Sequence, residues 1–431
     1  MNNNQTTDRP ELHFTPQAGW MNDPNGLIFA GGVYHLFYQH FPHGTKWGPM
    51  HWGHATSRDL LHWQHQPIAL YPTEDEYIFS GSAILDEKNA AGFATAGSGK
   101  PPMILFYTSH NPKTGEQTQS LAYSLDYANF TKYPGNPIIE NFAAAPSYKK
   151  DFRDPKVFEN PILGGWTMVL AAGDCVEFYH SANLLNWQFT GKYAMPLASQ
   201  IASQNCNQII FECPDCFCID DKWFLSASIV LPGKTEETHA MQYVAGTFDG
   251  KTFTAQIENT EQTPKLLDHA NQNYAAVTFA NCSKTIMLGW GEDWNLARQN
   301  NAAAYFGKMT IAKELGAVKI EDQFFIKQTP FIQIEENEAS PNLWEKHIII
   351  EENRSFCAQG LKIENRGSCI IINEMQINRP IFDQTGKLKN CSNPDIFSNC
   401  NNNNCHVQII FDHGYYEIFA DGGLICCSFE A

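Results

Sequence analysis

Three short motifs each place an acidic side chain beside residues that could tune its chemistry. They are Trp20-Met21-Asn22-Asp23-Pro24-Asn25-Gly26, Phe152-Arg153-Asp154-Pro155 and Ile209-Ile210-Phe211-Glu212-Cys213-Pro214-Asp215. Cleavage of a glycosidic bond requires one carboxylate that attacks and one carboxylic acid that protonates the leaving oxygen. The three acids are therefore the residue types that such a reaction needs, provided that the fold brings them together.

Each motif also has a purely structural interpretation. Residues 22–26 are a run of turn formers, which predicts a tight turn holding the carboxylate of Asp23 beside an indole. The proline after Asp154 favours an extended conformation for that residue, and its arginine neighbour could form only a surface ion pair. Glu212 ends an apolar strand before a predicted turn, where the glutamate could simply be leaving the core. The Phe and Cys around it would disfavour its charged form, as a general acid requires.

The chain that must position these acids is predicted to be almost entirely β. Residues 27–30 and 33–39 are β-rich runs separated by two glycines, which is a strong hairpin signal. Further on, a strand-like stretch, a polar turn and an aromatic residue recur, and the final aromatics are 67, 57 and 66 residues apart. Such a repeat is typical of β-propeller blades. The copies are Ser57 to Trp63, Ser124 to Phe130, Ser181 to Trp187 and Thr247 to Phe253.

Four copies and a further β-rich run over residues 274–290 predict a five-bladed β-propeller across residues 1–335. Residues 340–431 instead contain short strands between Asn- and Gly-rich turns, which predicts a C-terminal β-sandwich domain. The first strand of each propeller blade lines the central channel. The acids of blades one, three and four would therefore converge at one mouth of that channel.

The composition limits what the protein could bind. The 431 residues are 43% hydrophobic and carry a formal net charge of −17. The chain can thus bury a sizeable core, and its charge argues against nucleic acid or an anionic membrane as a partner. Residues 1–5 lack the features of a secretion signal, which predicts a cytoplasmic protein unless a leader has been removed. A neutral small molecule is the expected ligand.

The cysteines and histidines do not predict a metal site. The 13 cysteines are odd in number and scattered, which favours reduced thiols over a disulfide framework. The pair Cys213 and Cys216 is not followed by a second pair at zinc-ribbon spacing. The histidines between His35 and His65 lie among aromatic residues, so packing and hydrogen bonding explain them better than metal binding. Neither a metal nor an organic cofactor is expected.

Taken together, the three acid motifs resemble those of glycoside hydrolase family 32, the invertases, inulinases and levanases. The resemblance continues through residues 35–39, 47–55 and 79–83, and it covers most of residues 10–295. It implies a five-bladed propeller with an appended sandwich that hydrolyses β-fructofuranosides, such as sucrose and fructo-oligosaccharides, with retention of configuration.

The resemblance also implies roles for individual residues. Asp23 would be the nucleophile that forms a fructosyl-enzyme, and Glu212 would be the acid and then the base. Asp154, with Arg153 beside it, would hold sugar hydroxyls and stabilise the oxocarbenium-like transition state. The other expected residues of the fructosyl pocket are Asn22, Gln39, Trp47, Phe79 and Ser80, with Trp20 and Trp290 as an aromatic wall.

Two positions depart from the family pattern. The usual Asp-Phe-Tyr-Ala run reads Gln272-Asn273-Tyr274-Ala275, and the Asp-Arg motif of the sandwich reads Asp412-His413. Neither change touches the three acids. The first change lies where the rim of the pocket is expected, and so it leaves the preference for the leaving group open.

Several functions stay open from the sequence. Hydrolysis of sucrose or short fructo-oligosaccharides is the leading hypothesis. The alternatives are an exo-fructanase that acts on inulin or levan, and a fructosyltransferase in which a sugar replaces water. A catalytically silent fructan-binding module is disfavoured because all three acids are present. The sandwich also offers a β-rich surface for self-association into a homo-oligomer.

Overall fold

The computed structural model describes residues 9–94, 97, 99–141, 149–202, 208–233, 236–332, 339–382, 389 and 403–430. Most of them lie in strands, and helix is limited to short elements such as α1 (Trp294–Gln299) and the 3-10 turn η2 (Asp421–Gly423). This confirms the predicted all-β class. Within the described ranges, no helix is long and apolar enough to cross a membrane.

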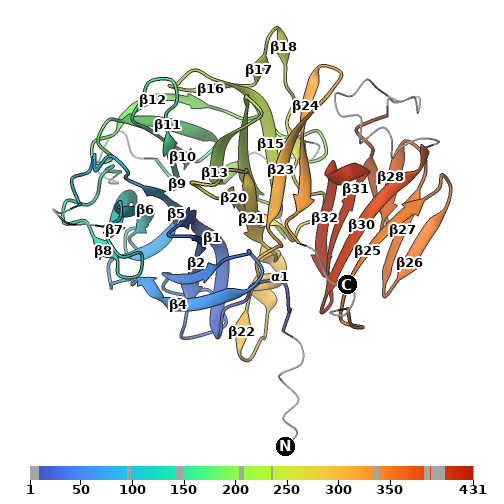
Figure 1. Ribbon diagram of the computed structural model, residues 1–431, viewed down its shortest axis with the longest axis horizontal. Coiled ribbons are helices and arrows are strands. Elements are labelled where there is room, and N and C mark those ends of the chain that lie inside the picture. The colour runs from blue at the N-terminus through green and yellow to red at the C-terminus, as the bar shows by residue number, and fades with distance from the viewer. Residues whose placement is uncertain are drawn as a thin grey trace, which may run out of the picture.

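Five sheets pack around a central axis as the blades of a propeller (Figure 1). Blade one contains β1 (Gly19–Ala30), β2 (Val33–Phe41), β3 (His51–Ser57) and β4 (Trp63–Leu70). Blade two contains β5 (Tyr77–Leu85), β6 (Met103–His110), β7 (Gln117–Ser124) and β8 (Thr131–Lys132). Blade three contains β9 (Phe152–Glu159), β10 (Trp166–Ala172), β11 (Cys175–Ser181) and β12 (Gln188–Tyr193).

The last two blades carry more irregular outer strands. Blade four contains β13 (Ile210–Ile219), β14 (Lys222–Leu231), β15 (Thr238–Phe248) and β16 (Phe253–Thr254), and β19 (Lys265–Leu266) also pairs with β15. A separate ribbon pairs β17 (Gln256–Ile257) with β18 (Thr260–Glu261). Blade five contains β20 (Tyr274–Thr278), β21 (Ile286–Trp290), β23 (Lys313–Ile320) and β24 (Gln323–Pro330). These sheets confirm the predicted five-bladed propeller.

The innermost strands of the blades, β1, β5, β9, β13 and β20, contact one another in a closed ring. Strand β1 meets β5 on one side and β20 on the other, where a bridge joins Ile28 to Ala280. Strand β22 (Tyr305–Phe306), which follows β21 in the chain, pairs in parallel with β1. Segments from the two ends of the propeller therefore lie together and close the ring.

The repeat found in the sequence is the turn between the third and fourth strands of a blade. In the first copy, Asp59 Oδ1 accepts the backbone N–H groups of Leu61 and His62. The next residue after each turn acid or amide has a positive φ, from 66° at Leu184 to 90° at Gly250. This is the local structure that makes Asp, Asn and Gly favourable in turns. The equivalent acceptors in the other copies are Asp126, Asn183 and Asp249.

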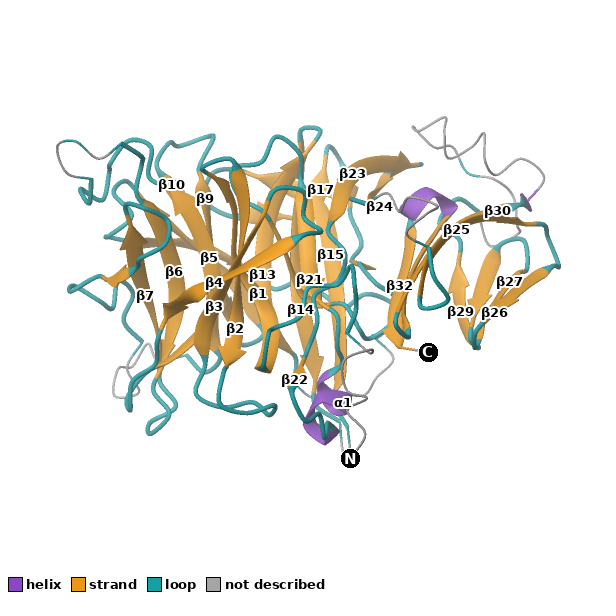
Figure 2. Ribbon diagram, turned by 60° about the horizontal axis from the view of Figure 1, so that its bottom comes forward, coloured by secondary structure: helices purple, strands orange, loops and turns teal. Residues whose placement is uncertain are grey.

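The C-terminal part is the predicted β-sandwich, which packs beside blade five (Figure 2). One sheet contains β25 (Leu343–Ile350), β30 (Cys405–Asp412), β31 (Tyr415–Ala420) and β32 (Ile425–Glu430). The other contains β26 (Ser355–Ala358), β27 (Leu361–Asn365), β28 (Cys369–Ile372) and β29 (Met375–Asn378). The predicted limits at residues 335 and 340 flank a stretch, 333–338, that lies outside the described residues, so these limits stay a prediction.

A buried charged network joins the sandwich to the propeller. His13 Nδ1 lies 2.7 Å from Asp412 Oδ2, and its Nε2 lies 3.1 Å from Glu417 Oε1. Lys313 of blade five lies 2.7 Å from the other oxygen of Glu417. Burial alone would lower the pKa of His13, but its bonds to the two carboxylates outweigh burial and raise that pKa. Opposite charges therefore offset the cost of burying these groups at the junction.

Candidate active site

A β-bulge interrupts the innermost strand of every blade. Each bulge leaves one extra residue on the inner strand relative to its partner, and such bulges re-aim side chains. The residues at these bulges line the central channel, so the bulges explain how strands deliver polar groups to one place. The bulges lie between Met21 and Pro24, Ile78 and Gly81, Arg153 and Lys156, Glu212 and Asp215, and Tyr274 and Val277.

The local conformations predicted for the acid motifs are wrong. Residues 22–26 lie inside strand β1 rather than in a turn, because pairing with β2 overrides their turn propensity and two bulges accommodate Pro24 and Gly26. Asp154 has a φ of 65° instead of an extended conformation, and Cys213 has a φ of 44° inside strand β13. Positive φ values at non-glycine residues are strained and cluster at functional sites.

A cavity of about 530 Å³ opens at the mouth of the channel, and Asp23, Asp154 and Glu212 all line it. This volume lies in the range typical of small-molecule sites. Five other predicted site residues also line it, namely Asn22, Gln39, Trp47, Phe79 and Arg153. The residues that sequence reasoning missed in this lining are Gln117, Ile210, Val230, Glu237, His239, Trp294 and Arg298.

Three predicted pocket residues lie behind the lining of this cavity. Ser80 is buried against Asp23, and Trp20 and Trp290 are 2% and 0% exposed. The ring of Trp294 lies 4.9 Å from that of Trp290 and 5.8 Å from that of Trp20. Of these three packed indoles, Trp294 is the one that lines the cavity, and the two predicted wall residues support it from within.

Both oxygens of Asp23 accept hydrogen bonds from residues of the predicted set. The hydroxyl of Ser80 donates to Oδ2 across 2.6 Å, and Asn22 Nδ2 donates to Oδ1 across 3.0 Å. Asn22 is itself oriented by Trp20, whose Nε1 donates to its Oδ1 across 2.7 Å. Burial raises the pKa of Asp23 despite these bonds, which act in the opposite direction. The carboxyl group is thus fixed in orientation at the cavity lining.

Glu212 is held through both of its carboxyl oxygens. Arg153 lies 2.7 Å from Oε1, and the Tyr274 hydroxyl donates to Oε2 across 2.5 Å. Arg153 also pairs with Asp151 at 2.9 Å, so its charge is shared among acids of blades three and four. Tyr274 belongs to the departing run expected at the rim, but it is fully buried against the acid. Side chains alternate between the two faces of a strand, and this alternation over the β-rich run that begins at Tyr274 could have placed its side chain beside the acid.

Asp154 and Cys213 lie in direct contact. The backbone N–H of Cys213 donates to Asp154 Oδ2 across 2.8 Å, and its Sγ lies 3.6 Å from both Asp154 Oδ2 and Asp23 Oδ2. Burial, opposed by Arg153, raises the pKa of Asp154 to about 7. The neighbouring Glu212 and Asp23 act in the same direction as burial. The close approach of like charges is characteristic of sites that tune proton affinity.

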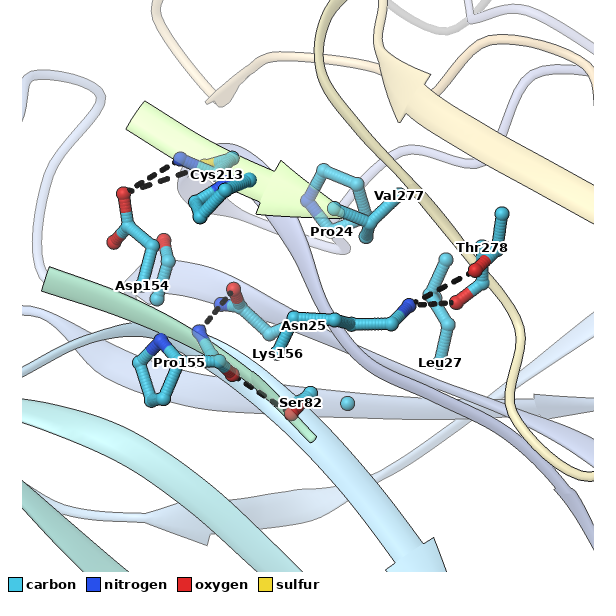
Figure 3. A pocket seen from close by; sticks show the side chains of 14 residues that line it. Pro24, Asn25, Leu27, Ser82, Asp154, Pro155, Lys156, Cys213, Val277 and Thr278 are labelled. Carbon is cyan, nitrogen blue, oxygen red and sulfur yellow. Dashed lines mark hydrogen bonds between the residues drawn. The ribbon is translucent and has the colours of Figure 1, made fainter. Parts of the chain in front are cut away.

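Two residues after Asp154, the side chain of Lys156 extends to Thr278 of blade five (Figure 3). Its Nζ lies 3.0 Å from Asp215 Oδ2 and donates to the carbonyl oxygen of Thr278 across 2.6 Å. Asp215, the last residue of the third motif, also accepts the N–H of Thr278 across 2.6 Å. Asp215 therefore ties blades three, four and five together, and it does not line the cavity.

Helix α1 supplies the wall of the cavity at blade five. Its N-cap, Asp293, accepts the N–H groups of Asn295 and Leu296, which satisfies donors of the first turn. Trp294 and Arg298 are four residues apart, and so they share one face of the helix. Arg298 lies 2.5 Å from Glu237 of the loop before β15. A six-residue helix has too little periodicity for sequence reasoning to find it.

Comparison with known proteins decides the family. The model of the glycosyl hydrolases family 32 N-terminal domain matches residues 13–330. The chain belongs to glycoside hydrolase family 32. This confirms the resemblance seen in the three acid motifs.

Family 32 relatives are similar over most of this chain. A levanase of Bacillus subtilis is 40% identical over 81% of this chain and 51% of its own length. An extracellular exo-inulinase of Aspergillus niger is 32% identical over 82% of this chain and 69% of its own length. An invertase of Schizosaccharomyces pombe is 33% identical over 76% of this chain and 56% of its own length. The chain therefore spans only about half of the levanase.

Solved structures of family 32 proteins share the fold across both parts of the chain. An exo-inulinase from Aspergillus awamori is 25% identical and matches with a TM-score of 0.77 over 100% of this chain and 94% of its own. A fructofuranosidase from Schwanniomyces occidentalis, solved with fructose, is 26% identical. It matches with a TM-score of 0.76 over 98% of this chain and 92% of its own. The propeller and sandwich are thus the arrangement found in these relatives.

Proposed function

We propose that this family 32 protein is a retaining β-fructofuranosidase that hydrolyses sucrose and short fructo-oligosaccharides. The observation that carries this proposal is the convergence of Asp23, Asp154 and Glu212 on one cavity, each with different hydrogen-bond partners. The relatives named levanase, exo-inulinase and invertase support a β-fructoside as the substrate. A neutral sugar also suits a protein with a net charge of −17.

Asp23 is the nucleophile in this proposal. Its two hydrogen bonds favour the ionised form and hold the carboxylate still, as attack on an anomeric carbon requires. Attack forms an ester bond between Asp23 and the anomeric carbon and breaks the bond from that carbon to the leaving oxygen. The product of this first step is a covalent fructosyl-enzyme.

Glu212 transfers the proton in both steps. It first donates its proton to the leaving oxygen, and it then removes a proton from the water that hydrolyses the ester. Tyr274 and Arg153 contact its two oxygens and thereby fix the plane of the carboxyl group. These two residues act through Glu212 and are positioning residues.

Asp154 binds sugar hydroxyls and stabilises the positive charge that develops on the sugar ring. Burial raises the pKa of Asp154 to about 7 and so opposes its negative charge. Positive charge at the anomeric carbon would favour its ionised form. Asp154 therefore interacts more strongly with the transition state than with the bound sugar, which is the condition for lowering the barrier.

An exo-fructanase is the second candidate. Relatives of this chain include a levanase and exo-inulinases, and Trp47, which lines the cavity, is 44% exposed. Such an enzyme would use the same acids but would accept a polymer as its leaving group. Fructosyl transfer and a binding module without catalysis remain further alternatives.

Time-resolved chromatography of products from sucrose, inulin and levan tests this proposal. The invertase-like reading predicts equimolar glucose and fructose from sucrose and little release from the polymers, whereas an exo-fructanase would release fructose from a polymer. Trisaccharides formed at high sucrose would reveal transfer. Calorimetric binding with no release of hexose would support a binding module.

The matched variants are Asp23→Ala and Asp75→Ala. Asp75 is a surface carboxylate whose side chain is 69% exposed, so its loss should leave turnover unchanged. Asp23→Ala should remove nearly all turnover while the protein stays folded, and an active, folded Asp23→Ala protein would overturn the proposal. The oligomeric state and the cellular location remain predictions, and light scattering would test the first of them.

A further inference from the structure

Four aromatic side chains form a continuous cluster at the mouth of the cavity. Trp47 lies in the loop after β2, Tyr77 and Phe79 lie on β5, and His110 ends β6. The Trp47 ring lies 6.2 Å from Tyr77 and 6.1 Å from Phe79, between ring centroids. Phe79 stacks on His110 at 4.3 Å, and His110 lies 6.2 Å from Tyr77. Each ring therefore touches two others of the cluster.

Only half of this cluster belongs to the cavity. Trp47 and Phe79 line it, whereas Tyr77 and His110 do not. Tyr77 and His110 are direct cross-strand partners of β5 and β6, and both are partly exposed. The cluster thus continues the aromatic wall of the cavity outward along the edge of blade two.

We propose that Tyr77 and His110 form an outer sugar-binding site, which holds a later unit of a fructo-oligosaccharide whose first units occupy the cavity. This inference rests on the proposed function, because it requires a chain that enters with its terminal fructosyl unit beside Asp23. Aromatic rings offer apolar faces of large area at low conformational cost, and the C–H faces of a sugar can pack on them.

The charge of the cluster fits such a ligand. Burial, together with the nearby charge of Arg153, lowers the pKa of His110, so its imidazole is neutral at neutral pH. The cluster itself then carries no charge, as suits a neutral sugar chain.

The opposite side of the mouth is less suitable for a longer chain. There, Arg298 and Glu237 form an ion pair at 2.5 Å, and both line the cavity. A chain that left the cavity over this pair would have to desolvate or separate two charges, and that opposes binding. The aromatic edge of blade two requires neither, so it is the favoured exit for a longer chain.

The test compares kcat/KM for sucrose with kcat/KM for an inulin-type pentasaccharide. Tyr77→Ala and His110→Ala should each lower the value for the pentasaccharide about tenfold, equivalent to about 1.4 kcal/mol, while the value for sucrose stays within about twofold. Tyr77→Phe should retain the wild-type value because the ring remains. Phe189→Ala, which removes a 49% exposed aromatic from the outer strand of blade three, is the matched control.

The outcomes separate this inference from the proposed function. Equal losses on both substrates, or no loss on the pentasaccharide, would overturn the outer site. If the wild-type protein hydrolysed no fructoside, the proposed function would fail. In that case, calorimetry with the pentasaccharide still decides the inference: Tyr77→Ala should weaken binding about tenfold, and unchanged or absent binding would reject the site.

Discussion

Ser80 donates its hydroxyl hydrogen to Oδ2 of Asp23 across 2.6 Å and thereby joins β5 of blade two to β1 of blade one. Both residues lie at bulges of innermost strands. The bond thus forms where the bulges of two adjacent blades meet. Ser80 is buried behind the cavity, and so it affects the reaction through the orientation and pKa of Asp23.

Ser80→Ala should lower kcat/KM for sucrose by about tenfold to a hundredfold, the usual effect of losing one hydrogen bond to a charged group. The hydroxyl of Ser80 lowers the pKa of Asp23, so its removal raises that pKa further. Asp23 must be ionised to attack. The acidic limb of the bell-shaped pH profile of kcat/KM should therefore move to higher pH.

Ser82→Ala is the control for that measurement. Ser82 lies on the same strand, but its hydroxyl bonds to the backbone of Pro155 and Val157 rather than to an acid. Its loss should reduce stability without moving the acidic limb. An identical shift in both variants, or no shift in Ser80→Ala, would contradict the role assigned to Ser80.

Asp154→Asn should stabilise the empty protein at alkaline pH. Burial raises the folded pKa of Asp154 from its ordinary value of 3.8 to about 7. The associated stability is therefore fully present below the unfolded pKa and is lost as pH rises through about 7. An asparagine cannot ionise and so avoids that loss, which amounts to at most about 4 kcal/mol.

Thermal melting at several pH values checks this prediction. Asp154→Asn should melt several degrees above the wild type near about pH 8, and the difference should vanish near about pH 4, where both side chains are neutral. Activity should fall at every pH. A variant less stable than the wild type at about pH 8 would show that the Arg153 contact outweighs the cost of burial.

The sequence predicted the blades better than the site, and the reason is physical. The turn after each third strand depends on short-range bonds from one Asp or Asn, so it leaves the same pattern in every copy. The five bulges depend on how neighbouring strands pair. The residues of a motif, such as 22–26 or 152–155, do not by themselves reveal that pairing. Local propensity therefore predicted a turn where the chain forms a bulged strand.

Cys213 should resist alkylation in the native protein. It is 5% exposed, and burial together with the neighbouring acids raises the pKa of its thiol well above the ordinary value. Only the thiolate reacts readily. Mass spectrometry after iodoacetamide should find Cys357, which is exposed, modified and Cys213 intact. Both should react in denaturant, and rapid native labelling of Cys213 would contradict its place between Asp23 and Asp154.

The junction between propeller and sandwich should be sensitive to single charges. Glu417 accepts bonds from His13 and the N–H of Ile311 and pairs with Lys313, all in the interior. Glu417→Gln leaves the buried lysine without its partner and should cost about 3 kcal/mol of unfolding free energy. Glu314→Gln, which breaks a surface pair with Lys284, should cost less than about 1 kcal/mol. Equal costs in denaturant titrations would refute this distinction.

The same network predicts how stability depends on pH. The folded pKa of His13 is raised, so its contribution is present below the unfolded value of 6.5 and is lost as pH rises through the folded pKa. The pKa values of Asp412 and Glu417 are lowered, so their contributions are lost as pH falls. The free energy of unfolding should therefore be largest at a pH between the folded pKa values of the two carboxyls and that of His13. The His13→Asn variant should show a flatter dependence of this free energy on pH on the alkaline side.

Several residues missed from the sequence lie far from the acid motifs along the chain. Trp294 and Glu237 line the cavity from blades four and five, and Tyr274 contacts Glu212; none of the acid motifs lies next to these three residues in the chain. The family resemblance implied Trp20 and Trp290 as wall residues, but it did not reveal which of three packed indoles faces the cavity. Tertiary packing decides that choice.

A covalent fructosyl-enzyme on Asp23 is the central claim, and rapid acid quenching during sucrose turnover tests it most directly. After proteolysis, mass spectrometry should find one fructosyl unit on the peptide that contains Asp23 in the wild type and none in Asp23→Asn. A label on Asp154 or Glu212 would contradict the assignment of the nucleophile. Continued hydrolysis of sucrose by the Asp23→Asn protein would contradict the mechanism itself.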